Sequence, residues 1–147
     1  MRQSTPLELS DLQEMLRLMP ELEQHIEIMQ ANMNSSEALG DAFAVRWDTA
    51  LLGCGGLLIP WPGVAVAWMI LTPTAKKHPI ATYRAIRSFL VDRVAKYDLV
   101  RIEASIHTHT SESRKLAETL GFTCEGLRLR YLPDGHDAWL YAWIRED

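Results

Sequence analysis

The stretch from Ile70 to Leu90 reads "ILTPTAKKHPIATYRAIRSFL" and joins the end of an apolar strand, a short basic loop and the start of an amphipathic helix. The helix that we predict from about Pro79 to Lys96 carries apolar residues at every third or fourth position. Free amides and the positive end of the dipole at the start of a helix attract anions. Lys76, Lys77 and His78 add positive charge, so the stretch predicts a strand, an anion-binding loop and a helix.

Two interpretations of this loop are open. In the first, a phosphate-bearing ligand binds at the start of the helix. In the second, the loop is a solvated basic segment without a ligand, since short motifs of this kind have modest specificity. Pro79 bears on the first interpretation, because proline has no backbone N–H to donate, although it costs the first turn of a helix little.

The length and composition of the chain indicate one domain over residues 1–147. With 147 residues, 48% of them hydrophobic, the chain can bury a core without a metal or a disulfide framework. Its two cysteines, Cys54 and Cys124, have no second Cys or His at ligand spacing, so we predict buried, reduced thiols and no metal centre. The net charge of −4 argues against general nucleic-acid binding.

The segment from Thr49 to Ala75 has no charged residue and is long enough to span a bilayer. Pro60, Pro62 and several glycines would break a helix in lipid, whereas apolar runs around a turn suit two buried strands. We therefore predict a strand hairpin here and no membrane partner. The start of the chain, "MRQSTPLELSDL", does not resemble a secretory signal, and a cytoplasmic location is expected.

The remaining helix-capping residues, prolines and apolar patterns predict an ordered series of helices and strands. Ser10 and Gln13 have the spacing of a capping box, and Pro20 suits the first turn of a second helix. The apolar faces of these helices are Leu12, Met15, Leu16 and Met19, then Leu22, Ile26, Met29 and Met33. Strands are predicted at about 42–47, 51–59 and 64–71.

The second half of the chain adds a strand, a helix and a hairpin. Apolar and polar residues alternate in "LVRIEASIHTH", which begins at Leu99, and this predicts a strand whose polar face carries Glu103 and His107. A short helix ends at Gly121, and two final strands flank the turn "LPDGHD". The order predicts an α/β (α+β) domain with a mixed, mostly antiparallel sheet flanked by helices.

Two strings resemble a known family. In "LTPTAKKHPIA", Leu71, Pro73, Ile80 and Ala81 fit the loop pattern V-x-P-x-x-R-G-x-G-I-G of the GNAT superfamily of acyl-CoA-dependent N-acetyltransferases, while Pro79 replaces a glycine. The string "TSESRKLAETLGFTCEGLRLRYLPDGHDAWLYAWI" is similar to the tail of the ribosomal-protein alanine acetyltransferase branch. The chain also resembles small GNAT-like phage proteins.

The resemblance implies that the chain binds acetyl-CoA or CoA. The end of the strand would meet the pantetheine arm, and backbone amides between Lys77 and Thr82 would hold the pyrophosphate. The implied cofactor-binding residues are Met69, Ile70, Leu71, Lys76, Lys77, His78, Ile80, Ala81, Thr82, Thr110 and Arg114. The two lysines would replace by charge what Pro79 cannot donate, which would make binding sensitive to salt.

The resemblance also implies catalytic groups. Acetyl transfer to an amine needs a base for the ammonium group and an acid for the departing thiolate. Ser113 matches a helix serine that partners the thiolate, whereas Ala117 stands where many members have a tyrosine. For the base we expect Glu103 first and His107 second. The structural alternatives are a local backbone bond for Ser113 and, for Glu103, pairing with a neighbour of Arg101 or with a helix arginine.

Two functions remain open. The first is an N-acetyltransferase that transfers an acetyl group from acetyl-CoA to an amine of a protein or small molecule. The second is a GNAT-fold phage effector that binds acetyl-CoA or CoA and modulates a host metabolic enzyme by direct contact. Aromatic residues such as Trp61 are compatible with a homodimer or a partner contact. No motif identifies the acceptor.

Overall fold

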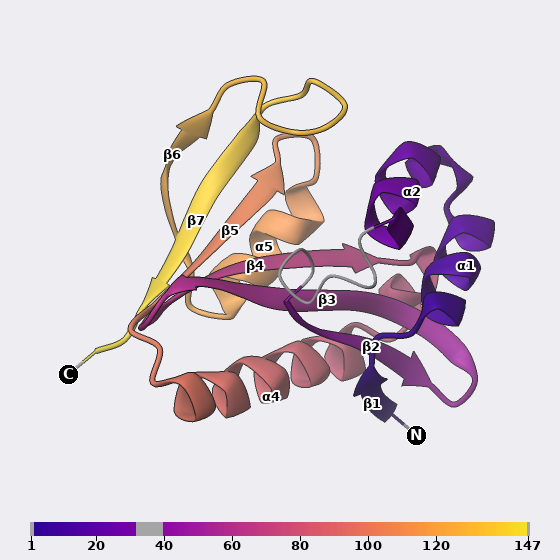
Figure 1. Cartoon of the computed structure of the whole chain (residues 1–147), viewed down its shortest axis with the longest axis horizontal. Helices are drawn as coiled ribbons and strands as arrows, with labels where there is room; N and C mark the ends of the chain where they lie inside the picture. The colour runs from indigo at the N-terminus through magenta and orange to yellow at the C-terminus, as the bar shows by residue number, and fades with distance from the viewer. Residues whose placement is uncertain (1, 32–39, 147) are drawn as a thin grey trace. The chain divides into compact units, whose positions relative to one another are not determined.

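The structure, a computed structural model, describes residues 2–31 and 40–146 (Figure 1). Its helices are α1 (Leu9–Leu18), α2 (Glu23–Ala31), α4 (Pro79–Tyr97) and α5 (Ser111–Thr119), with the 3-10 turns η1 (Pro20–Leu22) and η2 (Pro73–Lys77). Its strands are β1 (Arg2–Pro6), β2 (Asp41–Trp47), β3 (Ala50–Trp61), β4 (Val64–Leu71), β5 (Arg101–His107), β6 (Thr123–Arg128) and β7 (Ala138–Ile144).

The strands form a sheet in the order β1-β2-β3-β4-β5-β7-β6. Strands β4 and β5 pair in parallel, and the pairs β1–β2, β2–β3, β5–β7 and β6–β7 are antiparallel. The predicted fold class, an α+β chain with a mixed and mostly antiparallel sheet, is therefore confirmed. The contacts divide the chain into a first unit, Met1–Leu58 with Trp68–Ser88, and a second unit, Ile59–Ala67 with Phe89–Asp147. That residues 1–147 act as one domain stays a prediction.

In the first unit, α1 and α2 pack on β2 and β3 (Figure 1). The buried cluster that joins them comprises Leu12, Met15, Ile26, Met29, Ala44, Leu51 and Cys54. The predicted apolar faces are confirmed, since Leu16, Met19 and Leu22 pack against this cluster as partly buried side chains. Pro20 opens η1, which leads into α2 as expected, and Met33 lies outside the described residues.

The start of α1 differs from the prediction. The helix begins at Leu9 with Glu8 as its N-cap, so Ser10 already lies inside the first turn. The Glu8 N–H donates to Asp11 Oδ2 at 2.9 Å, and Asp11 Oδ1 accepts a hydrogen bond from Arg46 of β2 at 2.8 Å. An arginine 35 residues away thus supports a carboxylate cap, and the predicted pair of Ser10 and Gln13 is wrong.

One whole strand, β1, and the end of another, β3, were also not predicted. Strand β1 pairs with β2 from Arg2 opposite Trp47 to Pro6 opposite Phe43, although its sequence "RQSTP" has no apolar alternation. An edge strand needs only backbone partners, so its side chains carry little signal. Strand β3 runs through Trp61, and the turn to β4 is made at Gly63 with a φ of +89°.

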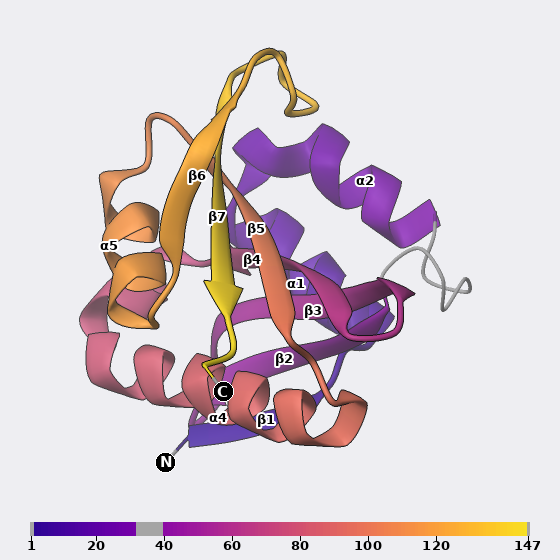
Figure 2. The same ribbon diagram turned by 90° about the vertical axis from the view of Figure 1, so that its left-hand side faces the viewer.

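In the second unit, β5 lies between β4 and β7, and β6 pairs with β7 (Figure 2). Leu99, Ile102 and Tyr141 are almost completely buried here. Helix α5 contacts β5, and the chain leaves it at Gly121, whose φ of +95° confirms the predicted left-handed terminator.

The two cysteines differ in exposure. Cys54 is buried in the first unit, as predicted, but Cys124 on β6 is exposed, so the prediction of two buried thiols is wrong for the second. Strand β6 is an edge strand of the sheet and most of its residues are exposed. Cys124 is exposed because it lies in this strand. Across residues 2–31 and 40–146, no helix has the length and apolar character needed to cross a membrane.

Candidate functional site

The loop that leaves β4 is fastened to β3 by Thr72. Its N–H donates to the Leu52 carbonyl at 2.9 Å, and its hydroxyl donates to the Leu51 carbonyl at 2.7 Å. Thr72 is 2% exposed, so these hydrogen bonds satisfy a buried polar side chain. Sequence reasoning passed over Thr72, although a threonine directly after an apolar strand is the available signal. The consequence is a fixed starting point for the basic loop.

The loop itself is a 3-10 turn followed by the first turn of α4. The His78 N–H donates to the Ala75 carbonyl at 3.0 Å, and both the N–H and the hydroxyl of Thr82 donate to the His78 carbonyl, at 3.0 and 2.8 Å. Pro79 has no N–H. The first N–H groups of a helix have no intrahelical acceptor. Among the described residues, the backbone N–H groups of Ile80 and Ala81 at the start of α4 therefore donate to no backbone carbonyl.

The positive side chains of the loop are arranged in two ways. Lys76 and Lys77 are exposed residues at the end of η2. His78 is partly buried and stacks on Trp47, with ring centroids 5.0 Å apart and the planes inclined by 21°. The lysines can therefore turn toward an anion, while the His78 ring is held by an aromatic neighbour.

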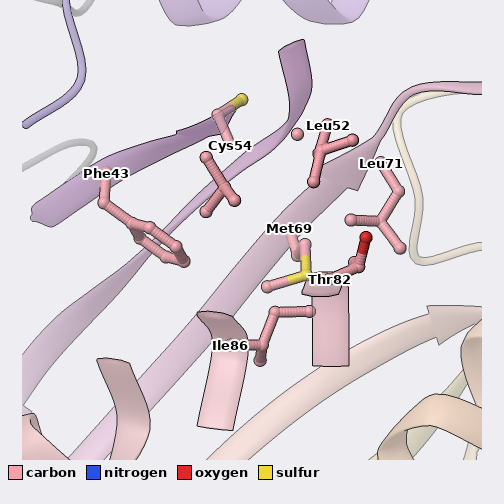
Figure 3. A pocket seen from close by; sticks show the side chains of 9 residues that line it. Phe43, Leu52, Cys54, Met69, Leu71, Thr82 and Ile86 are labelled. Carbon is pink, nitrogen blue, oxygen red and sulfur yellow. The ribbon is translucent and has the colours of Figure 1, made fainter. Parts of the chain in front are cut away.

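The end of β4 contributes to an apolar hollow in the first unit (Figure 3). Met69 and Leu71 enter it from β4, and Thr82 and Ile86 enter it from α4. Its cavity volume is about 10 Å³, which is room for about one water molecule and far too little for a small-molecule ligand. Ile70 lies on the opposite side of the strand and packs against the cluster under α1 and α2. Three predicted cofactor residues, Met69, Leu71 and Thr82, are therefore together, and Ile70 is not with them.

Cys54 also lines this hollow, but it is not a reactive thiol. Burial raises the pKa of Cys54 to about 12, and the charge of Asp11 adds to this effect. A thiol is nucleophilic as its thiolate, which Cys54 does not form near neutral pH. The hollow is consequently a packing feature without a nucleophile.

In the second unit, Glu103 shares an arginine with Glu125. Arg101 donates to Glu103 Oε1 from Nε at 3.2 Å and from Nη2 at 3.0 Å, and it donates to Glu125 Oε2 from Nη1 at 3.0 Å. These hydrogen bonds, first those of Glu125, raise the pKa of Arg101, and Arg101 lowers the pKa of Glu125. Glu103 therefore has an arginine partner, but this partner is Arg101 itself, two positions earlier in the strand, and not a neighbour of Arg101 or a helix arginine as the alternative had it.

His107 lies at the end of β5 and is held on both ring nitrogens. Its Nε2 is 3.1 Å from Asp134 Oδ2, and its Nδ1 accepts the backbone N–H of His109 at 3.1 Å. Since Nδ1 accepts a hydrogen bond, the neutral ring carries its proton on Nε2 and donates it to Asp134. His136 Nδ1 is also 3.1 Å from Asp134 Oδ2. Sequence reasoning missed this group because His107 ends β5, while Asp134 and His136 lie in the turn between β6 and β7.

The remaining predicted site residues lie in helix α5 or at its N-cap. The Thr110 hydroxyl donates to the His107 carbonyl at 2.8 Å, and Arg114 Nε donates to the Tyr141 hydroxyl at 2.9 Å. Ser113 is partly buried and has no hydrogen-bond partner among the described residues, so the expected local bond to the backbone is not formed. Ala117, at the position where many GNAT members have a tyrosine, is buried.

Tyr141 of β7 combines burial in the core with polar contacts. It is fully buried, accepts from Arg114, and donates to Glu118 Oε1 at 3.0 Å. Burial is the largest cause that raises the pKa of Tyr141. The Arg114 guanidinium also lies 5.0 Å from the centre of the Trp139 ring. This network joins α5 to β7, and it occupies the Nε of Arg114, a predicted cofactor residue.

The arrangement of strands and helices matches several solved structures. Ard1 from Thermoplasma volcanium matches with a TM-score of 0.77 at 11% identity, over 99% of each chain. The ribosomal-protein-S18-alanine N-acetyltransferase from Escherichia coli matches with a TM-score of 0.71 at 18% identity, over 98% of this chain and 94% of that one. The chain has the GNAT fold.

A further GNAT-fold match is RimL, a ribosomal L7/L12 alpha-N-protein acetyltransferase in complex with coenzyme A. It has a TM-score of 0.76 at 14% identity and covers 97% of this chain and 93% of that one. Comparison with protein-family models gives no match, and comparison with the sequences of curated proteins gives none either. At these identities the likeness establishes the GNAT fold alone, which is the fold that the resemblance of the two sequence strings implies.

Proposed function

We propose that this GNAT-fold chain binds acetyl-CoA and transfers the acetyl group to an amine of a protein or a small molecule. The observation that carries the proposal is the start of α4, where the amides of Ile80 and Ala81 have no backbone acceptor and follow two exposed lysines. Backbone N–H groups at a helix start and nearby ammonium groups are both suited to a pyrophosphate. A protein with the same fold, RimL, was solved with coenzyme A.

The loop offers few backbone N–H donors to a pyrophosphate. Pro79 has no N–H, and the amides of His78 and Thr82 already donate within the loop. Two amides therefore remain, and the positive charge of Lys76 and Lys77 supplies the rest of the attraction. Exposed charges are screened by salt, whereas short amide hydrogen bonds are screened less, so the affinity for CoA falls with ionic strength.

For catalysis we propose Glu103 as the base and Ser113 as the proton donor. Arg101 has two carboxylate partners, and the three groups together carry a net charge of −1 when all are ionised. Glu103 can take up a proton while the pair of Arg101 and Glu125 stays neutral. His107 is the second choice as base, because protonation of its Nδ1 requires that the His109 N–H contact opens.

Ser113 is proposed as the acid because its hydroxyl is not used by the described part of the chain. The acetyl-CoA thioester supplies the acetyl group, and the chain has to provide a proton for the sulfur that leaves. Tyr141 is less suited, since it is fully buried and already bonded to Arg114 and Glu118. We expect Tyr141 to position α5, on which Ser113 lies.

A second function, a GNAT-fold effector that binds CoA and regulates a host enzyme by contact, is favoured by one observation. Ala117 fills with a buried methyl group the position at which many members carry a tyrosine hydroxyl. If Ser113 does not replace that hydroxyl, the chain can bind acetyl-CoA without turnover. The two proposals share the ligand and differ in the chemistry.

Calorimetry followed by a thiol-release assay separates the proposals. Both use C124S protein, because the exposed Cys124 would react with the thiol reagent. Acetyl-CoA is titrated first, and then turnover is measured with spermidine, with peptides that begin with alanine or serine, and with a lysine peptide. Heat and thiol release with one amine support the transferase. Heat without release on any amine favours the effector, and no heat with acetyl-CoA or CoA overturns both.

A further inference from the structure

A cluster of three side chains in the second unit joins His107, the second choice as base, to two residues that the proposed acetyl transfer does not use. His107, Asp134 and His136 each offer one ligand atom, and these atoms all lie within 4.8 Å of one another. His107 ends β5, while Asp134 and His136 lie in the turn between β6 and β7. We propose that these three residues form a binding site for a divalent transition-metal ion of the zinc type.

The distances suit such an ion. Asp134 Oδ2 is 3.1 Å from His107 Nε2 and 3.1 Å from His136 Nδ1. Two ligand atoms that bind one zinc ion at about 2.0–2.2 Å stand about 3.3 Å apart in a tetrahedron. Two of the three ligand pairs are therefore close to the required spacing. The two imidazole nitrogens, which lie within 4.8 Å of each other, have to approach by up to about 1.5 Å.

The chemistry of the donors selects the metal class. Two imidazole nitrogens and one carboxylate oxygen suit zinc, nickel and copper, whereas calcium and magnesium prefer oxygen ligands throughout. The fourth position of a tetrahedron is left for water. The His109 ring packs against both imidazoles, with centroids 5.2 Å from each, and shields one side of the cluster.

The backbone holds the ligands in place. Asp134 Oδ1 accepts the His136 N–H at 2.9 Å, which aims Oδ2 at the two rings. The Gly135 N–H donates to the Leu132 carbonyl at 2.8 Å, and Gly135 has a φ of +81°. The Thr108 N–H reaches the Asp137 carbonyl at 3.2 Å and joins the two turns. A bound ion would strengthen this link between β5 and the β6–β7 turn.

Metal binding has a specific consequence for His107. In the free protein its proton is on Nε2, because Nδ1 accepts the His109 N–H at 3.1 Å. An ion on Nε2 takes the lone pair there, so the ring proton moves to Nδ1 and the His109 N–H contact opens. The exchange of tautomers, from Nε2–H to Nδ1–H, is visible in long-range proton–nitrogen NMR spectra of the imidazole.

The test is a zinc titration of the full chain without a histidine tag, in the C124S background so that an exposed thiol does not bind the metal. We expect binding by calorimetry and a change of the His107 tautomer on adding zinc. Each of H107A, D134N and H136A should weaken zinc binding by more than the roughly 10–100-fold that loss of an outer partner costs. His78→Ala, a histidine of the first unit, should bind zinc as the parent does.

Two results overturn the proposal. One is that the parent does not bind zinc, which leaves the cluster as a set of hydrogen bonds. The other is that H107A, D134N and H136A bind zinc with the affinity of the parent, which places the metal elsewhere. Asp134 and His136 are exposed, so D134N and H136A are expected to fold, and circular dichroism checks this for each variant. None of these measurements uses acetyl transfer, so they test the metal site independently of the proposed function.

Discussion

The loop after β4 and the turns around β5 and α5 are built in opposite ways. The loop is a continuous piece of chain, and the groups proposed to bind CoA are backbone amides and exposed lysines between Lys76 and Ala81. The β5 and α5 region is built from side chains that lie far apart in sequence, such as Arg101 with Glu125 and His107 with Asp134, separated by 24 and 27 residues. Backbone sites can be recognised from a local pattern, whereas side-chain clusters depend on strand pairing.

The largest expected difference between the two units concerns their cysteines. At pH 8 a thiol with a pKa of about 12, that of Cys54, is about one part in 10⁴ thiolate. We expect Cys54 in folded C124S protein to react with a thiol reagent at least roughly 1000-fold more slowly than Cys124 in C54S protein. The reaction is followed by absorbance, and denatured C124S protein provides the control for complete reaction. Fast modification of Cys54 in the folded state would show that the hollow opens.

Ser113→Ala tests the side-chain site of the second unit. If the hydroxyl protonates the leaving thiolate, kcat for acetyl transfer falls by about 100-fold, while the affinity for acetyl-CoA is unchanged. Ser111→Ala, an exposed serine of the same helix, is the matched control and should keep the parental kcat. Parental kcat in Ser113→Ala would remove Ser113 from the proposed mechanism.

Gly53→Ala tests how tightly the first unit is packed near the end of β4. A Cβ at Gly53 would stand 2.6 Å from the Ile70 carbonyl oxygen, so backbone has to move. We expect the free energy of unfolding to fall by roughly 1–3 kcal/mol, measured by urea denaturation.

Gly126→Ala is the matched control for Gly53→Ala, because a Cβ at Gly126 meets nothing within 4 Å. Its free energy of unfolding should change by less than about 0.5 kcal/mol. Equal effects of the two substitutions would contradict the close approach of β3 to Ile70.

Reversal of the lysine charges has the smallest expected effect. Lys76→Glu with Lys77→Glu should weaken the binding of CoA about tenfold at low salt, and less at high salt because exposed charges are screened. Arg17→Glu with Lys96→Glu makes the same change of net charge at exposed positions elsewhere. Calorimetry at two salt concentrations compares the pairs, and equal affinities would show that backbone amides alone hold the pyrophosphate.

Local patterns predicted much of this fold. The strand Val64–Leu71 has the predicted bounds, α4 starts at the predicted Pro79, and Gly121 ends α5. In each case the signal lies within a few residues of the feature, since apolar periodicity, proline and glycine act on the neighbouring backbone. Strand β1 is the opposite case. Its polar sequence gives no strand signal, because it is held in the sheet by backbone pairing with β2.

The candidate site was predictable in its backbone part and not in its side-chain part. The sequence indicated the anion-binding helix start and the polar face of β5, but it did not indicate that Thr72 fastens the loop or that Glu103 shares Arg101 with Glu125. The exposure of Cys124 was likewise wrong, because exposure depends on the position of a strand in the sheet.

The sequence by itself determined where the chain turns and where it extends, because these properties follow from neighbouring residues. That the start of α4 receives an anion stays a prediction. Tertiary structure alone decided which side chains meet. Pairing of β6 and β5 with β7 places Glu125 beside Arg101 and the β6–β7 turn beside His107. A shift of one residue in that register would turn these side chains to the other face, so no local pattern encodes the partners.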